Sequence, residues 1–121
     1  MPAHTVHLHI EQGATFDRTW TWKTGTPPAT PTVVDLTGCV ARAQMRATLE
    51  SDDILLALTT ENGRIVLGGT AGTIQIVIDA DTTAAIDWTD AVYDLEIVFA
   101  DGTVVRRMQG SVCVSPGVTR D

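Results

Sequence analysis

Residues 92–115 read VYDLEIVFADGTVVRRMQGSVCVS, two runs of alternating apolar and polar residues with Asp101 and Gly102 between them. A period of two is typical of β-strands, because successive side chains point to opposite faces of a sheet. Asp-Gly between two such runs predicts a hairpin with a type I′ turn, which needs positive φ at both central positions. The stretch therefore predicts two paired strands, residues 92–99 and 103–115.

Each strand of this hairpin is predicted to bury one face against another layer of the fold. In the first strand the inward side chains are expected to be Tyr93, Leu95, Ile97 and Phe99. In the second strand one shared face is expected to carry Val104, Met108, Val112 and Val114.

Strand patterns separated by turn residues fill most of the preceding chain. The predicted strands are residues 5–10, 15–22, 39–48, 54–59, 64–67 and 73–78, with residues 54–59 expected to be buried. Residues 79–86 (DADTTAAI) instead predict one or two helical turns that cross between sheets, and Trp88 is expected to pack over them. About seven or eight strands with one short crossover helix predict an all-β chain, folded as a two-sheet antiparallel β-sandwich. The length of the chain fits a single domain over residues 1–121.

Composition and charge narrow the classes of partner. Among 121 residues, 8 are Lys or Arg and 15 are Asp or Glu, which gives a net charge of −7. Nucleic acid and anionic membranes both need a basic surface, so neither is expected as a partner. The N-terminal stretch lacks the layout of a secretory signal, and no apolar run approaches the ~20 residues of a membrane helix. We expect a protein made and folded in a cytoplasm, with an acidic surface that suits a basic protein partner.

The two cysteines, Cys39 and Cys113, are too few for a disulfide scaffold. Free, buried thiols that act as small apolar residues are expected. A bridge between two strands stays open as an alternative.

Few residues offer catalytic or metal-binding chemistry. His7 and His9 share one face of a predicted strand, with His4 close by, and a His-x-His pair can place two imidazoles on one metal. No further Cys or His follows at a usual ligand spacing, so solvated histidines are expected, with no metal and no cofactor.

The sequence gives no sign of a nucleophilic serine. The motif G-x-S-x-G is missing, and no serine is near a histidine in sequence. A catalytic triad assembled in space stays open as an alternative. Carboxylate pairs fall mostly in predicted turns, so the chain is not expected to be an enzyme.

Aromatic residues raise the alternative of a ligand-binding platform. The set consists of Trp20, Trp22, Trp88 and Tyr93. In a sugar-binding module such rings line an exposed surface, whereas in a core they fill the space between sheets. The core is the favoured interpretation. Arg18 interrupts the face that carries Trp20 and Trp22, so one end of that face is expected to reach solvent or a partner.

Candidate partner contacts come from a proline-rich stretch and from arginines. Residues 24–32 contain prolines, which lack the backbone donor of a sheet ladder, so a loop or an edge crossing open to a partner is expected. Residues 39–48 alternate small apolar side chains with polar ones that include two arginines. The candidate partner-contacting residues are Arg18, Pro27, Pro28, Pro31, Arg42 and Arg46.

The order of several motifs resembles a family of viral proteins. The motifs are IEQGATFDRTWTWK at 10–23, VDLTGCVARAQMR at 34–46, the aspartate- and alanine-rich crossover at 79–86, VYDLE at 92–96, the Asp-Gly hairpin, and GSVCVSPGVT at 110–119. Together they are similar to the small tail-associated proteins of tailed bacteriophages, and to the N-terminal domain of phage baseplate upper proteins. The resemblance covers nearly the whole chain.

The resemblance implies an immunoglobulin-like β-sandwich that is a structural part of a virion assembled in the bacterial host cytoplasm, with no catalytic residues to carry over. It implies an adaptor or anchor subunit at the tail tip, baseplate or fibre attachment region. Its expected partners are other phage virion proteins and copies of itself, as a homo-oligomer or symmetric ring. Two alternatives stay open: a capsid decoration (cement) protein, and a carbohydrate-binding module that uses Trp20 and Trp22.

Overall fold

The computed structural model describes residues 3–24 and 30–119, and it is mainly β, with 51% strand and one short α-helix. In chain order its elements are β1 His4–Thr5, β2 Leu8–Glu11, β3 Phe16–Thr21, β4 Lys23–Thr24, β5 Thr32–Val33, β6 Val40–Arg46, β7 Leu56–Thr59, β8 Ile65–Leu67, a 3-10 turn Gly69–Ala71, β9 Thr73–Ile78, α1 Ala80–Ala84, β10 Asp90–Val98 and β11 Val104–Ser115. No helix in the described part of the chain is long and apolar enough to cross a membrane.

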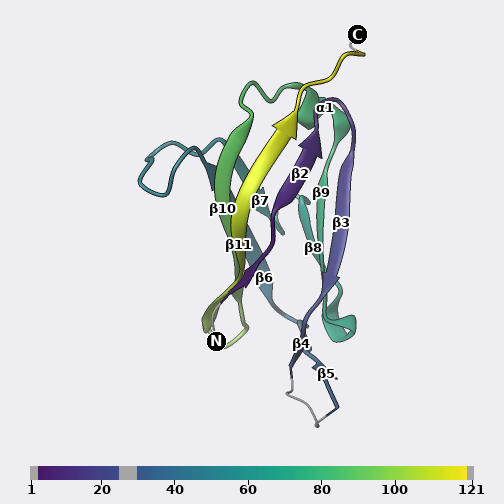
Figure 1. Cartoon of the computed structure of the whole chain (residues 1–121). Helices are drawn as coiled ribbons and strands as arrows, with labels where there is room; N and C mark the ends of the chain where they lie inside the picture. Colours follow the sequence, from purple (N-terminus) through teal and green to yellow (C-terminus); the bar gives the residue numbers. More distant parts are fainter. Residues whose placement is uncertain (1–2, 25–29, 120–121) are drawn as a thin grey trace.

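The larger sheet has six strands in the described residues, ordered β1-β11-β10-β6-β7, with β2 also paired to β11. β10 pairs antiparallel with both β11 and β6, which confirms the predicted hairpin. β1 and β2 run parallel to β11, so this sheet is mixed and the prediction of antiparallel pairing throughout is wrong. The parallel direction follows from the chain path, because β2 and β11 both run toward the end of the molecule that carries α1 (Figure 1).

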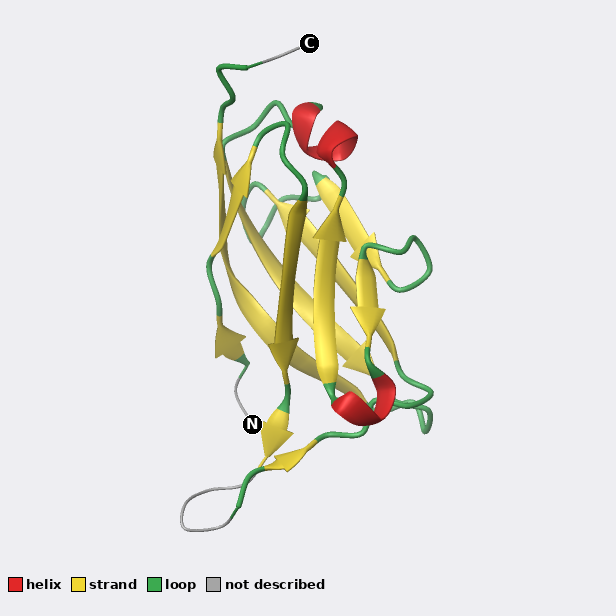
Figure 2. Ribbon diagram, turned by 90° about the vertical axis from the view of Figure 1, so that its right-hand side faces the viewer, coloured by secondary structure: helices red, strands yellow, loops and turns green. Residues whose placement is uncertain are grey.

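The smaller sheet has the order β3-β9-β8, and β4 and β5 form a separate two-stranded ribbon at the end opposite α1 (Figure 1). The smaller sheet lies in front of the larger sheet in Figure 2. Both sheets contribute buried side chains to one core. The larger sheet supplies Leu8, Ala43, Met45, Leu95 and Ile97 among others, and the smaller sheet supplies Phe16, Ile65, Ile74, Ile76 and Ile78. Alternation predicted most of these correctly, because one face of each strand is buried.

A β-bulge interrupts the pairing of β10 with β11. Leu95 lies opposite Met108 and Glu96 lies opposite Arg106, so Arg107 is an extra residue in β11. Such an insertion breaks the regular alternation of faces along the bulged strand.

The bulge overturns one predicted core residue. Val104 was expected to share the buried face of Met108, but it is 46% exposed, whereas its neighbour Val105 packs against the core. The prediction is wrong because alternation counted along the sequence shifts by one residue at the bulge.

The hairpin loop also differs from the expected type I′ turn. The Phe99 N–H donates to the Thr103 carbonyl at 2.8 Å and the Gly102 N–H donates to the Phe99 carbonyl at 2.9 Å, so the loop has three residues, 100–102. Only glycines have positive φ in the described residues, and Gly102 is at 90°. Asp101 stabilises this turn by accepting a hydrogen bond from the Thr103 N–H at 2.9 Å.

The crossover helix α1 connects β9 of the smaller sheet with β10 of the larger sheet, as predicted. Asp79 caps it by accepting a hydrogen bond from the Thr82 N–H at 2.9 Å, and the hydrogen bonds from Thr82 lower the pKa of the Asp79 carboxyl. Thr83 is fully buried, donates to the Ala14 carbonyl at 2.8 Å and accepts from the Gly13 N–H at 3.0 Å. The helix is thereby fixed to the turn between β2 and β3.

Two smaller expectations are wrong. The segment predicted as a buried strand over residues 54–59 becomes β7 only from Leu56, and Ile54 before it is 47% exposed. Cys39 and Cys113 are free thiols, but Cys113 is exposed rather than buried because it lies on the outward face of β11.

The bulge leads to a testable difference between two residues of β11. Met108→Ala should lower the free energy of unfolding by about 2–5 kcal/mol, because the side chain is buried and its removal leaves a cavity. Val104→Ala should cost less than about 1 kcal/mol, since the side chain faces solvent. Urea denaturation of both variants measures this, and equal losses would contradict the bulge.

Candidate functional site

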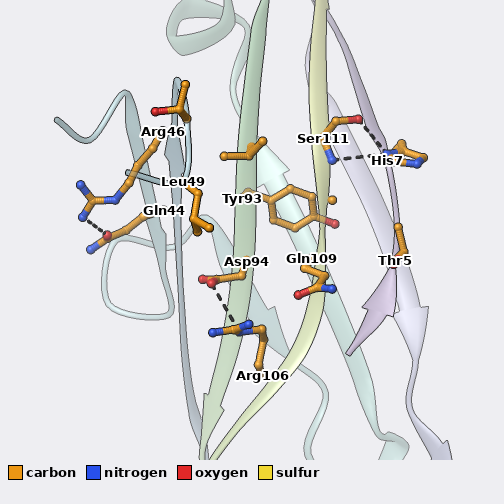
Figure 3. A pocket seen from close by; sticks show the side chains of 13 residues that line it. Thr5, His7, Gln44, Arg46, Leu49, Tyr93, Asp94, Arg106, Gln109 and Ser111 are labelled. Atoms are coloured by element: carbon orange, nitrogen blue, oxygen red, sulfur yellow. Dashed lines mark hydrogen bonds and ion pairs between the residues drawn. The ribbon is translucent and has the colours of Figure 1, made fainter. Parts of the chain in front are cut away.

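A groove of about 560 Å³ lies on the outer face of the larger sheet, over β6, β10 and β11 (Figure 3). Its floor includes Gln44, Val92, Asp94 and Arg106. One wall is the loop that follows β6, and the other is the N-terminal segment, which contributes Thr5 of β1 and His7 just before β2. The site therefore combines residues from both ends of the chain.

The floor carries paired opposite charges. The Arg106 Nε lies 3.5 Å from the Asp94 Oδ2, and the Arg42 Nε lies 2.8 Å from the Glu96 Oε1 farther along the same face. The arginine side chains are exposed and the carboxylates are partly exposed at the surface, so each pair contributes little to stability. Arg42 lies on the outward face of β6, as its place in the sequence predicted, but it is outside the lining of the groove.

Arg46 holds the first wall in place. Its Nη1 donates to the Ser51 carbonyl at 2.8 Å and its Nη2 donates to the Gln44 Oε1 at 2.7 Å. These bonds tie the loop after β6 to the sheet, and Leu49 of that loop is 82% exposed at the edge of the groove (Figure 3). The predicted contact residue Arg46 thus positions an apolar side chain that the sequence did not single out.

His7 and Ser111 meet on the second wall (Figure 3). The Ser111 Oγ lies 2.7 Å from the His7 Nδ1, and the Ser111 N–H donates to the same nitrogen at 3.3 Å. The short Ser111 Oγ–His7 Nδ1 contact is one shared hydrogen bond, and the tautomer of the imidazole determines which of the two groups donates. A nucleophilic triad would need a carboxylate on the imidazole, and no described carboxylate is hydrogen-bonded to His7.

The position of the second wall depends on one backbone contact. The Val6 N–H donates to the Gln109 carbonyl at 2.8 Å, and the Tyr93 hydroxyl donates to the Val6 carbonyl at 2.7 Å. A Cβ on Gly110 would lie 2.3 Å from the same carbonyl oxygen, so only glycine permits this approach. Burial raises the pKa of Tyr93, so the phenol keeps its proton and stays a donor. His7 is the next residue after Val6, so the contact between the Val6 backbone and Gly110 also determines the position of His7.

The other predicted contact residues lie elsewhere. Arg18 is exposed on β3 of the smaller sheet, with its guanidinium carbon 4.9 Å from the centre of the Trp20 ring. Pro31 is exposed beside β5, and Pro27 and Pro28 lie outside the described residues. Of the described candidates, only Arg46 lines the groove, and Arg42 lies farther along the same strand, β6.

The aromatic residues are mainly part of the core. Trp22 and Tyr93 are buried, while Trp20 and Trp88 are half-buried against the core. The Arg107 guanidinium carbon lies 4.9 Å from the centre of the Trp22 ring, and burial lowers the pKa of Arg107. A flat platform made of Trp20 and Trp22 is not formed, because Trp22 is covered.

No group of three or more His, Cys, Asp or Glu comes together as a metal site in residues 3–24 and 30–119.

No protein-family model matches the chain, and no curated protein matches its sequence.

The close approach at Gly110 can be tested by filling it. Gly110→Ala should lower the free energy of unfolding by about 1–3 kcal/mol, because the new methyl group collides with the Val6 backbone. Ser111→Ala, on the next residue, removes only an exposed hydrogen bond and should cost less than about 0.5 kcal/mol. Thermal and urea unfolding give both values, and a neutral Gly110→Ala would contradict the contact.

Proposed function

We propose that this chain is a structural virion protein of a tailed bacteriophage, an adaptor or anchor subunit at the tail tip, baseplate or fibre attachment region. It acts by docking onto other virion proteins and not as an enzyme. The fold proposed with this function is an immunoglobulin-like β-sandwich. Two sheets that share one core support that fold, and the order of motifs along the chain supports the phage assignment.

The docking role is supported mainly by the groove on the larger sheet. It is an open surface on a sheet face, with exposed Leu49 beside paired charges and the polar side chain of Gln109. Protein interfaces combine an apolar contact with a polar rim in this way, whereas small-molecule sites enclose most of the ligand. A neighbouring subunit is therefore the ligand that fits the groove.

Counting the chain in phage particles tests the proposal. Quantitative mass spectrometry of particles made from the genome that encodes this chain should find it at a copy number set by tail symmetry, far below that of the major capsid protein. A copy number close to that of the capsid protein would instead favour a decoration protein. Its absence from the particles would contradict the proposal.

A matched pair of valines tests the role of the groove in the same particles. Val92, at the floor of the groove, is 37% exposed, and Val66, on the outer face of the smaller sheet, is 46% exposed. Val92→Glu should prevent incorporation, because it replaces an apolar contact in the floor of the groove by a longer, charged side chain that must lose its water in the interface. Val66→Glu makes the same chemical change elsewhere and should be incorporated normally. Equal incorporation of two folded variants would contradict docking through the groove.

A further inference from the structure

A second hollow, of about 540 Å³, lies between the entry to β7 and the segment that follows α1. It shares no lining residue with the groove on the larger sheet. Its apolar lining comes mainly from Ile54, Leu55, Leu56, Ile86 and Trp88.

These apolar side chains are not fully used by the fold. Ile54 is 47% exposed, and Leu55, Leu56 and Trp88 are only half-buried at the margin of the core. A half-covered tryptophan next to exposed aliphatic side chains is the composition of an interface anchor site. An apolar side chain of a partner would bury the part of these side chains that is still exposed to solvent.

The rim of this hollow is acidic. Asp81 and Asp87 are both exposed and both line it, and no lysine, arginine or histidine is among its lining residues. Neither carboxylate takes part in an ion pair with another described residue, unlike Asp94 and Glu96 on the larger sheet. A partner with negative charges at this position would be repelled, and one with positive charges would be attracted.

We propose that this hollow docks a basic, apolar segment of a partner protein. An aliphatic or aromatic side chain of the segment packs against Trp88 and Ile54, while flanking lysines or arginines face Asp81 and Asp87. The inference does not depend on which particle contains the chain. It gives the molecule a second docking surface, distinct from the groove in both position and charge.

Titration of the ¹⁵N-labelled full chain with three short synthetic peptides tests the proposal by NMR. One peptide has a Leu-Phe centre flanked by lysines, the second has the same centre flanked by glutamates, and the third has lysines around a Gly-Ser centre. Only the first should give saturable shifts at millimolar concentration in the Trp88 indole N–H and in the amides of residues 54–56 and 85–88. This binding should also weaken with added salt.

Substitutions in the hollow test whether its negative charge and its apolar lining determine the affinity for the peptide in a protein that stays folded. The double variant Asp81→Asn, Asp87→Asn should weaken binding of the first peptide at least about threefold. The control Asp17→Asn, Glu61→Gln removes the same charge from exposed positions on other elements outside the hollow and should change the affinity less than about twofold. Ile54→Ser should abolish the shifts without unfolding the protein, because the side chain is already half exposed.

Three results would overturn the proposal. The first is equal binding of the lysine- and glutamate-flanked peptides, and the second is a set of shifts that maps outside the hollow. The third is no saturable shift with the first peptide. None of these results bears on incorporation into phage particles, so the two proposals fail independently.

Discussion

The approach of the Val6 carbonyl to Gly110 determines where the start of the chain lies on the larger sheet. A side chain at residue 110 would occupy the space of that carbonyl, and the Tyr93 hydroxyl supplies the hydrogen bond that the carbonyl needs. With the backbone fixed at this point, β1 and β2 pair with β11 on either side of Val6. His7 is then held beside Ser111, and the N-terminal segment becomes one wall of the groove.

The groove depends equally on the opposite wall, where Arg46 joins the loop after β6 to the sheet. Its two hydrogen bonds use a guanidinium that also remains partly accessible at the surface. The larger sheet thus presents a floor between two walls, each held by specific polar contacts. Surfaces that are held in place before binding lose less conformational entropy on association, which is consistent with the docking role that we propose. The acid-rimmed hollow near α1 is a second surface of different chemistry, and two such surfaces are consistent with the adaptor role that we propose.

The sequence predicted most of the strands, the hairpin and the crossover helix because period-two alternation and turn residues are local signals. It missed β4 and β5, and it predicted one strand over residues 5–10 where the structure has β1 and β2 with a break at Val6 and His7. It placed Arg42 and Arg46 on the outward face of one strand for the same reason. It failed at Val104, since a single inserted residue in β11 depends on pairing with β10 and leaves no mark in the local pattern. It also missed the contact between His7 and Ser111, which are 104 residues apart and meet only through the parallel pairing of the N-terminal segment. Leu49 gave no signal, because a lone leucine in a polar turn looks the same in sequence whether or not a groove lies beside it.

Amide hydrogen exchange of the full chain tests most directly whether the N-terminal segment is fixed as described. The Val6 N–H donates to the Gln109 carbonyl, so its exchange should be strongly slowed. Tyr93→Phe removes only the hydroxyl that bonds to Val6, and it should speed exchange at Val6 by up to about tenfold beyond any change at Leu95, which reports global unfolding. Unprotected exchange at Val6 in the unaltered protein, or the same change at Val6 and Leu95 in the variant, would contradict the account.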